Sequence, residues 1–146
     1  MKVFAILRVT PGRLLAAVTA AVCLILTADA VRMAQKEPPV LLANDYDRAL
    51  YLKASGLEVD PTPVWQKEIF LADPPDGDTA AYLSMLEEQG YRPQEHLGRP
   101  LTVTCYRSLQ DESLLARVLT DGDELVGADR FYATPDADPY LPLLPC

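Results

Sequence analysis

Apolar positions recur with two different periods along the chain, and these periods separate predicted helices from predicted strands. Helical spacing predicts a first helix over about 44–55, with Asn44 as its N-terminal cap and Gly56 just beyond its last turn. A second helical pattern is predicted to begin at a cap on Asp78 and to end at Gly90. The two helices are separated by a segment with a different pattern.

A two-residue alternation of apolar and polar positions indicates strands elsewhere in the chain. Four such segments cover about residues 64–71, 101–106, 114–120 and 124–132. Between the last two segments, Asp121-Gly122 predicts a hairpin with a type I′ turn, because Asp-Gly tolerates positive φ. The order of elements favours an α+β domain in which two helices pack on one face of a mostly antiparallel sheet of about four strands. If the second helix crosses that sheet, its apolar side chains should be buried against the first strand, which gives a specific test with Leu83 and Leu86 against Trp65 or Ile69.

The first 43 residues differ from the rest of the chain in charge and hydropathy. They hold five basic and two acidic residues, a net charge of +3, whereas the remaining residues hold 8 basic and 19 acidic residues, a net charge of −11. An uncharged apolar run of 15 residues, 14–28, follows the basic residues at the start. This asymmetry predicts that the N-terminus stays in the cytoplasm.

We therefore expect residues 1–33 to form a cytoplasmic tip and a signal anchor, with 14–33 as the transmembrane helix of a single-pass membrane protein. The domain that follows would then be extracytoplasmic. The alternative is a signal peptide that ends at Ala30, because Ala28-Asp29-Ala30 has the small-x-small pattern of a cleavage site. In that case the protein would be secreted.

The remaining chain divides into a linker over 34–43, a folded domain over 44–132 and a tail over 133–146 that is rich in proline and aspartate. We expect the tail to be irregular. Its apolar residues are a candidate contact surface that can dock in a partner's groove or, as we favour, on its own domain. These residues are Tyr140, Leu141, Leu143 and Leu144.

Composition narrows the classes of function. With 146 residues, 49% of them hydrophobic, the chain has material for one globular domain. The net charge of −8 argues against a nucleic-acid partner, because phosphate contacts need clustered lysine and arginine. One histidine and three cysteines leave little material for a zinc site. We expect no metal and no cofactor.

Several segments together resemble a known family. They are Gly56-Leu57-Glu58-Val59 followed by Pro61 and Pro63, the helix end Tyr82 to Tyr91, Gly98 ahead of the strand from Thr102 to Tyr106, and the strand–Asp-Gly–strand from Ala116 to Asp129. Over about residues 45–131 the chain resembles domain of unknown function 4830, found in membrane-anchored proteins of Gram-positive gut bacteria. It departs from that pattern at Ala128, where a second glycine is usual, and in the tail from Asp136 to Pro145. The resemblance implies a location and a fold and assigns no activity.

Acidic residues near the predicted hairpin are the first candidates for chemistry. They are Asp121, Asp123, Glu124, Asp129, Asp136 and Asp138. Carboxylates in a turn can supply some of the six to eight oxygen ligands of calcium. The ordered ligand series of a calcium loop is absent from the sequence, so we expect a solvated turn. A calcium-stabilised structural domain is kept as an alternative.

His96 is the only histidine and the basis of an enzymatic alternative, an envelope hydrolase that uses His96 with a carboxylate. Such a site would need a nucleophile such as Ser108 or Cys105 nearby. The sequence has neither a nucleophile elbow nor a known catalytic cysteine signature. We therefore expect no catalytic residue.

Cys105 and Cys146 are a candidate disulfide, because an extracytoplasmic domain can be oxidised. This bond would hold the tail against the sheet. The alternative is that Cys105, which alternates with apolar neighbours, is a buried free thiol. Taken together, the sequence favours a non-enzymatic extracytoplasmic module that acts through contacts with an unknown envelope protein.

Overall fold

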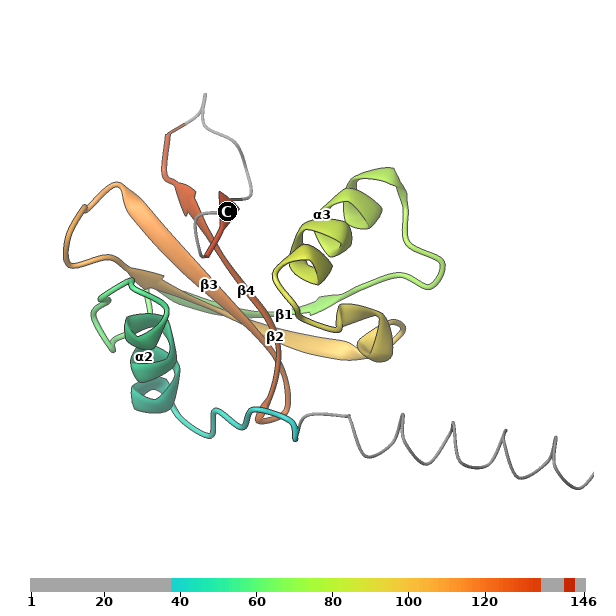
Figure 1. The fold of residues 1–146 in the computed structure, drawn as a ribbon, viewed down its shortest axis with the longest axis horizontal. Helices are drawn as coiled ribbons and strands as arrows, with labels where there is room; N and C mark the ends of the chain where they lie inside the picture. The colour runs from blue at the N-terminus through green and yellow to red at the C-terminus, as the bar shows by residue number, and fades with distance from the viewer. Residues whose placement is uncertain (1–37, 135–140, 144–146) are drawn as a thin grey trace, which may run out of the picture. The chain divides into compact units, whose positions relative to one another are not determined.

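The computed structural model describes residues 38–134 and 141–143. Their secondary structure follows the order helix, strand, helix and then a series of strands (Figure 1). The elements are α2 (Asp45–Ala54), β1 (Trp65–Phe70), α3 (Gly77–Glu88), a 3₁₀ helix η1 (Pro93–His96), β2 (Pro100–Arg107), β3 (Leu114–Asp121), β4 (Glu124–Tyr132) and β5 (Leu141–Pro142). Both predicted helices and all four predicted strands are therefore present.

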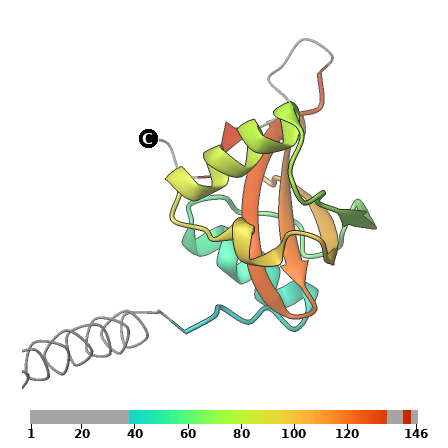
Figure 2. The ribbon, with the colours of Figure 1, turned by 90° about the vertical axis from the view of Figure 1, so that its right-hand side faces the viewer.

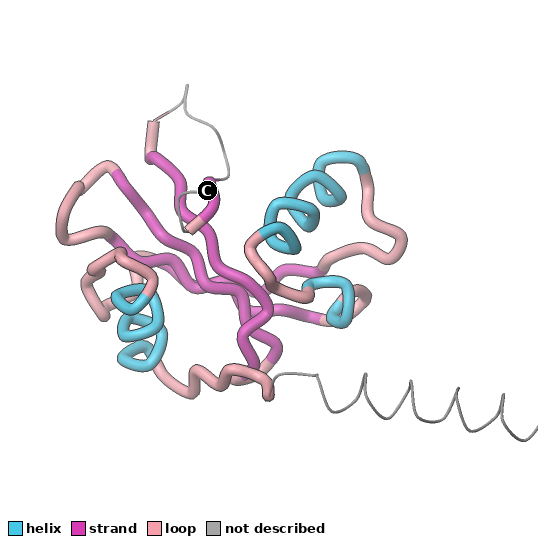
Figure 3. The backbone as a smooth tube through the Cα atoms, in the orientation of Figure 1, coloured by secondary structure: helices cyan, strands magenta, loops and turns pink. Residues whose placement is uncertain are grey.

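The strands, magenta in Figure 3, form one sheet. Their order is that of the chain, β1-β2-β3-β4-β5, and each strand is antiparallel to its neighbours. This confirms an α+β fold with an antiparallel sheet. The sheet has five strands instead of about four, because two residues of the tail, Leu141 and Pro142, pair with Arg130 and Asp129 of β4. The expectation of an irregular tail is wrong at these two residues.

The caps of α2 follow the local sequence. The Asn44 side chain accepts a hydrogen bond from the Asp47 backbone N–H at 3.0 Å, which satisfies one of the unpaired donors of the first turn. At the other end Gly56 has a φ of 88°, and the Leu57 N–H donates to the Leu52 carbonyl at 2.9 Å. This is the Schellman arrangement that glycine allows.

The second helix, α3, has the same kind of C-terminal end and a different start. Gly90 has a φ of 90°, and the Tyr91 N–H donates to the Leu86 carbonyl at 3.2 Å. The N-terminal cap is Asp76, whose side chain accepts from the Thr79 N–H at 2.8 Å, and not Asp78 as predicted. The helix thus begins one residue before Asp78, which lies exposed in the first turn.

The two helices cover opposite faces of the sheet, so the prediction that both lie on one face is wrong. Figure 2 shows α3 in front of the strands and α2 behind them. Two residues of β2 confirm that the helices lie on opposite faces. Val103 belongs to the cluster that packs with α3, and Tyr106, three residues further along, belongs to the cluster that packs with α2. Successive side chains of a strand point to opposite faces. Both faces are covered, and even the polar side chain of Thr104 on β2 is fully buried.

Each face has its own group of buried residues. The α2-face cluster joins α2, the strands and the tail and comprises Leu42, Leu52, Leu57, Val59, Tyr106, Leu114, Ala116, Val118, Ala128 and Leu143. The α3-face cluster comprises Leu71, Tyr82, Leu83, Leu86, Leu101, Val103, Leu119 and Val126. In the second cluster Leu83 and Leu86 are fully buried, and Trp65 and Ile69 pack against it. This confirms that Leu83 and Leu86 are buried in the cluster against which Trp65 and Ile69 pack.

The hairpin between β3 and β4 is confirmed, and its details differ from the prediction. Asp121 pairs with Glu124 across Gly122 and Asp123, and among these residues only Gly122 has positive φ, at 60°. A type I′ turn needs positive φ at both central positions, so glycine at the first position indicates type II′ geometry instead. A bulge then shifts the register between Leu119 and Thr120.

The segment before α2 contacts the same hairpin. Leu41 forms an isolated bridge with Glu124, the Leu42 N–H donates to the Asp123 carbonyl at 2.7 Å, and Leu42 is buried in the α2-face cluster. The last part of the segment predicted as a linker is therefore part of the folded domain.

The predicted membrane helix, 14–33, and residues 34–37 of the predicted linker lie outside the described residues. Among the residues that the structure does describe, no helix combines the length and the apolar character needed to cross a membrane. The transmembrane helix stays a prediction.

Candidate functional site

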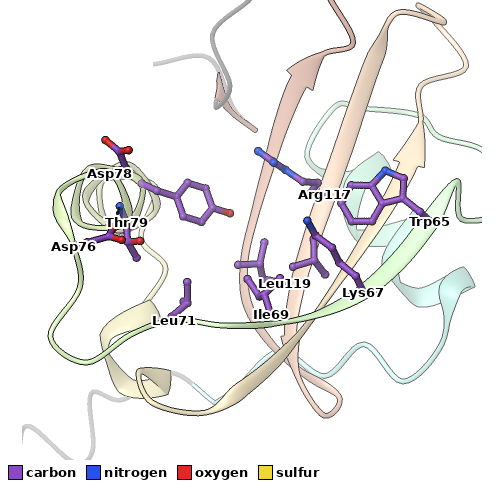
Figure 4. Close-up of a pocket in the computed structure, with 11 residues that line it drawn as sticks. Trp65, Lys67, Ile69, Leu71, Asp76, Asp78, Thr79, Arg117 and Leu119 are labelled. Carbon is purple, nitrogen blue, oxygen red and sulfur yellow. Dashed lines mark hydrogen bonds between the residues drawn. The ribbon is translucent and has the colours of Figure 1, made fainter.

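A cleft of about 250 Å³ lies on the α3 face, between the first half of α3 and strands β1, β2 and β3 (Figure 4). Its lining combines apolar side chains with charged ones. The lining residues are Trp65, Lys67, Ile69, Leu71, Asp76, Asp78, Thr79, Tyr82, Val103, Arg117 and Leu119. No single stretch of sequence holds them, and the antiparallel order of the strands brings them together.

The cleft exists because α3 covers only part of this face. Leu86 of α3 contacts Gly127 of β4 so closely that a Cβ atom at Gly127 would lie 2.8 Å from the Leu86 Cδ1 atom. A glycine at this position lets the helix settle over β4. The side chains that β1 presents on the same face, including Trp65 and Ile69, remain half-buried and border open space.

One wall of the cleft is fixed by a buried charge network. Asp129, which is fully buried, accepts hydrogen bonds from the Arg117 Nε at 2.8 Å and from the Tyr82 hydroxyl at 2.6 Å. The Arg117 Nη2 atom lies 2.7 Å from the Asp129 Oδ1 atom, which also accepts the hydrogen bond from Nε. The centre of the guanidinium group lies 4.4 Å from the Phe131 ring centroid. Such a pair holds its geometry because either charge alone would be costly to bury.

Burial is the largest influence on the Asp129 carboxyl group and raises its pKa above the ordinary value. The charge of Arg117 and the hydrogen bonds from Tyr82 and Arg117 act in the opposite direction and favour the carboxylate. The network thus couples α3, through Tyr82, to the centre of the sheet. It positions the wall of the cleft without exposing the carboxylate to a ligand.

The rim of the cleft carries charges that are more accessible. Lys67 lies over the Trp65 ring, with its ammonium nitrogen 5.1 Å from the centroid, and no acidic partner is found for it within the described ranges. Asp76 and Asp78 lie at the start of α3 on the other wall (Figure 4). The hydrogen bonds from Thr79 lower the pKa of Asp76, which keeps it ionised.

His96 lies at another place, beside the β3–β4 hairpin. Its Nδ1 atom is 2.9 Å from an Asp121 carboxylate oxygen, which Arg99 also contacts at 3.3 Å. The Nε2 atom of His96 is 3.9 Å from Glu124. The hydrogen bond with His96 is the main reason why the pKa of Asp121 is lowered. This cluster attaches η1 to the hairpin.

The structure does not bring His96 together with either candidate nucleophile. Asp121, the partner of His96, is next to Thr120, which pairs with Thr102 of β2. Ser108 lies six residues beyond Thr102, or about 20 Å along the chain at a rise of ~3.3 Å per residue. The Ser108 hydroxyl instead accepts hydrogen bonds from the backbone N–H groups of Gln110 and Asp111, at 3.1 and 3.3 Å. Cys105 lies three residues beyond Thr102, or about 10 Å along β2 at the same rise, and pairs with Arg117 of β3.

The acidic residues considered for calcium are separated in the fold. Asp121 pairs with His96 and Arg99, and Asp129 is buried with Arg117 on another part of the sheet. No group of three or more potential metal ligands occurs within residues 38–134 and 141–143. Two of the candidates, Asp136 and Asp138, lie outside the described residues.

The cysteine and tail candidates have mixed outcomes. Cys105 is buried and has no disulfide partner among residues 38–134 and 141–143, and burial raises the pKa of its thiol to about 11. Cys146 lies outside the described residues, so the disulfide stays a prediction. Leu143 is buried in the α2-face cluster, and its backbone N–H donates to the Gln89 side chain at 2.7 Å.

The tail, as far as the structure describes it, docks on its own domain. Leu141 is half-buried and Leu143 is covered, so Leu143 does not form part of an exposed contact surface. Tyr140 and Leu144 lie outside the described residues. The tail is a candidate contact surface on sequence grounds, and the structure adds the cleft on the α3 face as a second one.

None of the charged residues that line the cleft was expected from the sequence to form a site, and Asp129, which holds Arg117 in place behind the wall, was expected only as an acidic residue near the hairpin. A partial signal for the Arg117–Asp129 pair exists, because an arginine and an aspartate on the two strands of a hairpin, one residue away from opposite positions, can form a cross-strand pair. The bulge concealed that signal by changing the register, so that Arg117 pairs with Asp129. Comparisons with models of known protein families, with curated proteins and with solved structures give no match for this chain.

Proposed function

We propose that this chain is a non-enzymatic module of the cell envelope that acts by binding another protein, and that the cleft beside α3 is its binding surface. The observation that carries this proposal is the composition of the cleft. Apolar side chains form the floor of the cleft, and charged side chains line its walls. One wall is held in place by the Arg117–Asp129–Tyr82 network. A few polar groups around an apolar depression are typical of binding sites.

The proposed location rests on the sequence. The charge asymmetry around the apolar run and the resemblance to domain of unknown function 4830 both support a signal anchor at 14–33, with the described domain outside the cytoplasm. The intact mass of the protein from its native envelope tests this. A full-length mass is expected, whereas a mass that begins at Val31 would mean release after Ala30.

The binding role is tested by blocking the cleft. In the variant Ile69→Arg a charged side chain occupies the floor of the cleft, whereas Leu50→Arg places the same side chain on the exposed side of α2. We expect the Ile69→Arg chain, solubilised from the envelope, to migrate as a free chain and the Leu50→Arg chain to remain in a larger assembly. Both variants should first give the circular dichroism spectrum of the native domain. An unchanged assembly for Ile69→Arg would contradict the proposal.

A further inference from the structure

The two walls of the cleft carry opposite charges. Asp76 and Asp78 lie on the α3 wall, and Lys67 lies on the β1 wall beside Trp65 (Figure 4). The positive charge of Arg117 is offset by Asp129 within the protein. The cleft is therefore acidic on one side and basic on the other.

A ligand with one sign of charge suits only one of these walls. An anionic group that meets Lys67 is repelled by Asp76 and Asp78, and a cationic group that meets the two aspartates is repelled by Lys67. Juxtaposed like charges are a common means by which interfaces reject the wrong partner. The partner that complements both walls carries both charges.

The space between the walls indicates what separates those charges. The floor is formed by Ile69, Leu71, Val103 and Leu119, which are all apolar. Its volume of about 250 Å³ is below the range of about 300–1,000 Å³ that is typical of small-molecule pockets. A space of this size fits one apolar side chain that anchors a larger partner, as buried anchors do at protein interfaces.

We propose that the cleft recognises an extended segment of a partner protein in which an apolar side chain fills the cleft, with an acidic side chain toward Lys67 and a basic one toward Asp76 and Asp78. Side chains two residues apart lie on the same side of an extended chain. The segment therefore has the pattern acid-x-apolar-x-base, in either chain direction. This inference rests on the proposed function and adds the chemistry of the partner.

Blocked synthetic peptides test the pattern. The probes are acetylated and amidated Glu-Ala-Leu-Ala-Lys and its neutral, all-acidic and all-basic counterparts, with Gln, Glu or Lys at both ends. Trp65 is the only tryptophan and lines the cleft, so its single indole N–H resonance reports binding. At physiological salt we expect the mixed-charge peptide to bind about five- to tenfold more tightly than the neutral one, from two partly exposed charge contacts.

Charge reversal on one wall gives a sharper test. In Lys67→Glu both walls are acidic, so the preferred probe should change from the mixed-charge peptide to the all-basic one. Lys53→Glu makes the same change in net charge on the exposed side of α2 and should leave the preference unchanged. Likewise, Asp78→Asn should weaken binding of the mixed-charge peptide, whereas Asp47→Asn, in the first turn of α2, should not.

Two results would overturn the inference. If the native protein prefers the all-basic peptide, the cleft responds to net negative charge and not to a two-sided pattern, although it still binds. If no peptide shifts the Trp65 resonance at millimolar concentration, the cleft does not take an apolar-anchored segment. The assembly of the Ile69→Arg chain then decides the proposed function separately.

Discussion

The two faces of the sheet are built from the same strands and differ in what covers them. On the α2 face, the helix, the segment at Leu42 and the tail at Leu143 all contribute to one buried cluster. On the α3 face, the helix lies over β4, and a charge network and a cleft occupy the rest. The difference shows that one antiparallel sheet can have one face closed by a helix and terminal segments and the other left partly open.

Polar groups also have different roles on the two faces. On the α2 face the Tyr106 hydroxyl donates to Asp45 at 2.7 Å, and Arg48 contacts the same carboxylate at 3.0 Å. These contacts connect α2 to β2. On the α3 face Arg117 lines the cleft, and the buried Asp129 holds it in place. The same kind of interaction closes one face and shapes a cleft on the other.

The largest effect is expected from breaking the α3-face network. Asp129→Ala should lower the free energy of unfolding by about 3–5 kcal/mol, because it leaves the partly buried Arg117 without its counter-charge. Urea denaturation followed by Trp65 fluorescence measures this. The double variant Arg117→Met with Asp129→Leu should recover much of the loss while changing the wall of the cleft. A double variant as unstable as Asp129→Ala would show that the charges have a further structural role.

The α2 face should respond as a closed core. Leu52 is fully buried, so Leu52→Ala should cost about 2–5 kcal/mol of unfolding free energy. Leu50, 47% exposed on the same helix, provides the control, and Leu50→Ala should change stability by less than about 0.5 kcal/mol. Peptide binding at the cleft should survive in Leu52→Ala below its melting temperature. A loss of binding in the folded variant would mean that the two faces are not independent.

The close packing of α3 on β4 is the next feature to test. Gly127→Ala places a Cβ atom 2.8 Å from Leu86, so α3 must shift, at a cost of about 1–3 kcal/mol. Gly77→Ala is the control, because it has open space and lies at the start of the same helix, where it should stabilise by about 0.4–1 kcal/mol. Thermal denaturation of both variants gives the comparison. Equal melting temperatures would contradict the close contact.

The smallest effect is a pH dependence at the hairpin. Folding holds the pKa of Asp121 below its value in the unfolded chain, mainly through His96. Its contribution to stability is therefore present above about pH 4, the ordinary aspartate value, and is lost as the pH falls through the lowered pKa. Asp121→Asn should flatten the loss of stability between pH 5 and 2, measured by urea denaturation. Asp76 and Asp111, whose pKa values are also lowered, should preserve part of the slope.

Local features of the fold could be predicted from sequence because they depend on neighbouring residues. Asn44, Gly56 and Gly90 define helix ends through caps and positive φ, and all three predictions are confirmed. The placement of helices on faces depends on distant contacts. The largely apolar run 114–120 was a signal that both faces of β3 are buried, and it argued against one solvated face.

The cleft could not be predicted from sequence for a related reason. Its walls come from β1, β2, β3 and α3, and their alignment depends on strand register. The bulge at Leu119 and Thr120 aligns Arg117 with Asp129, whereas an uninterrupted hairpin from Asp121 and Glu124 would pair Arg117 with Ala128. A single extra residue thus decides which side chains share a face.

The central claim is that the cleft, and not the α2 face, contacts a partner. Photo-cross-linking in the native envelope tests it most directly, with a photoreactive amino acid at position 67 on the rim of the cleft and, in a second chain, at position 53 on α2. We predict a cross-linked protein from position 67 that disappears in Ile69→Arg, and none from position 53. Cross-links from position 53 alone, or a position-67 product that persists in Ile69→Arg, would contradict the account.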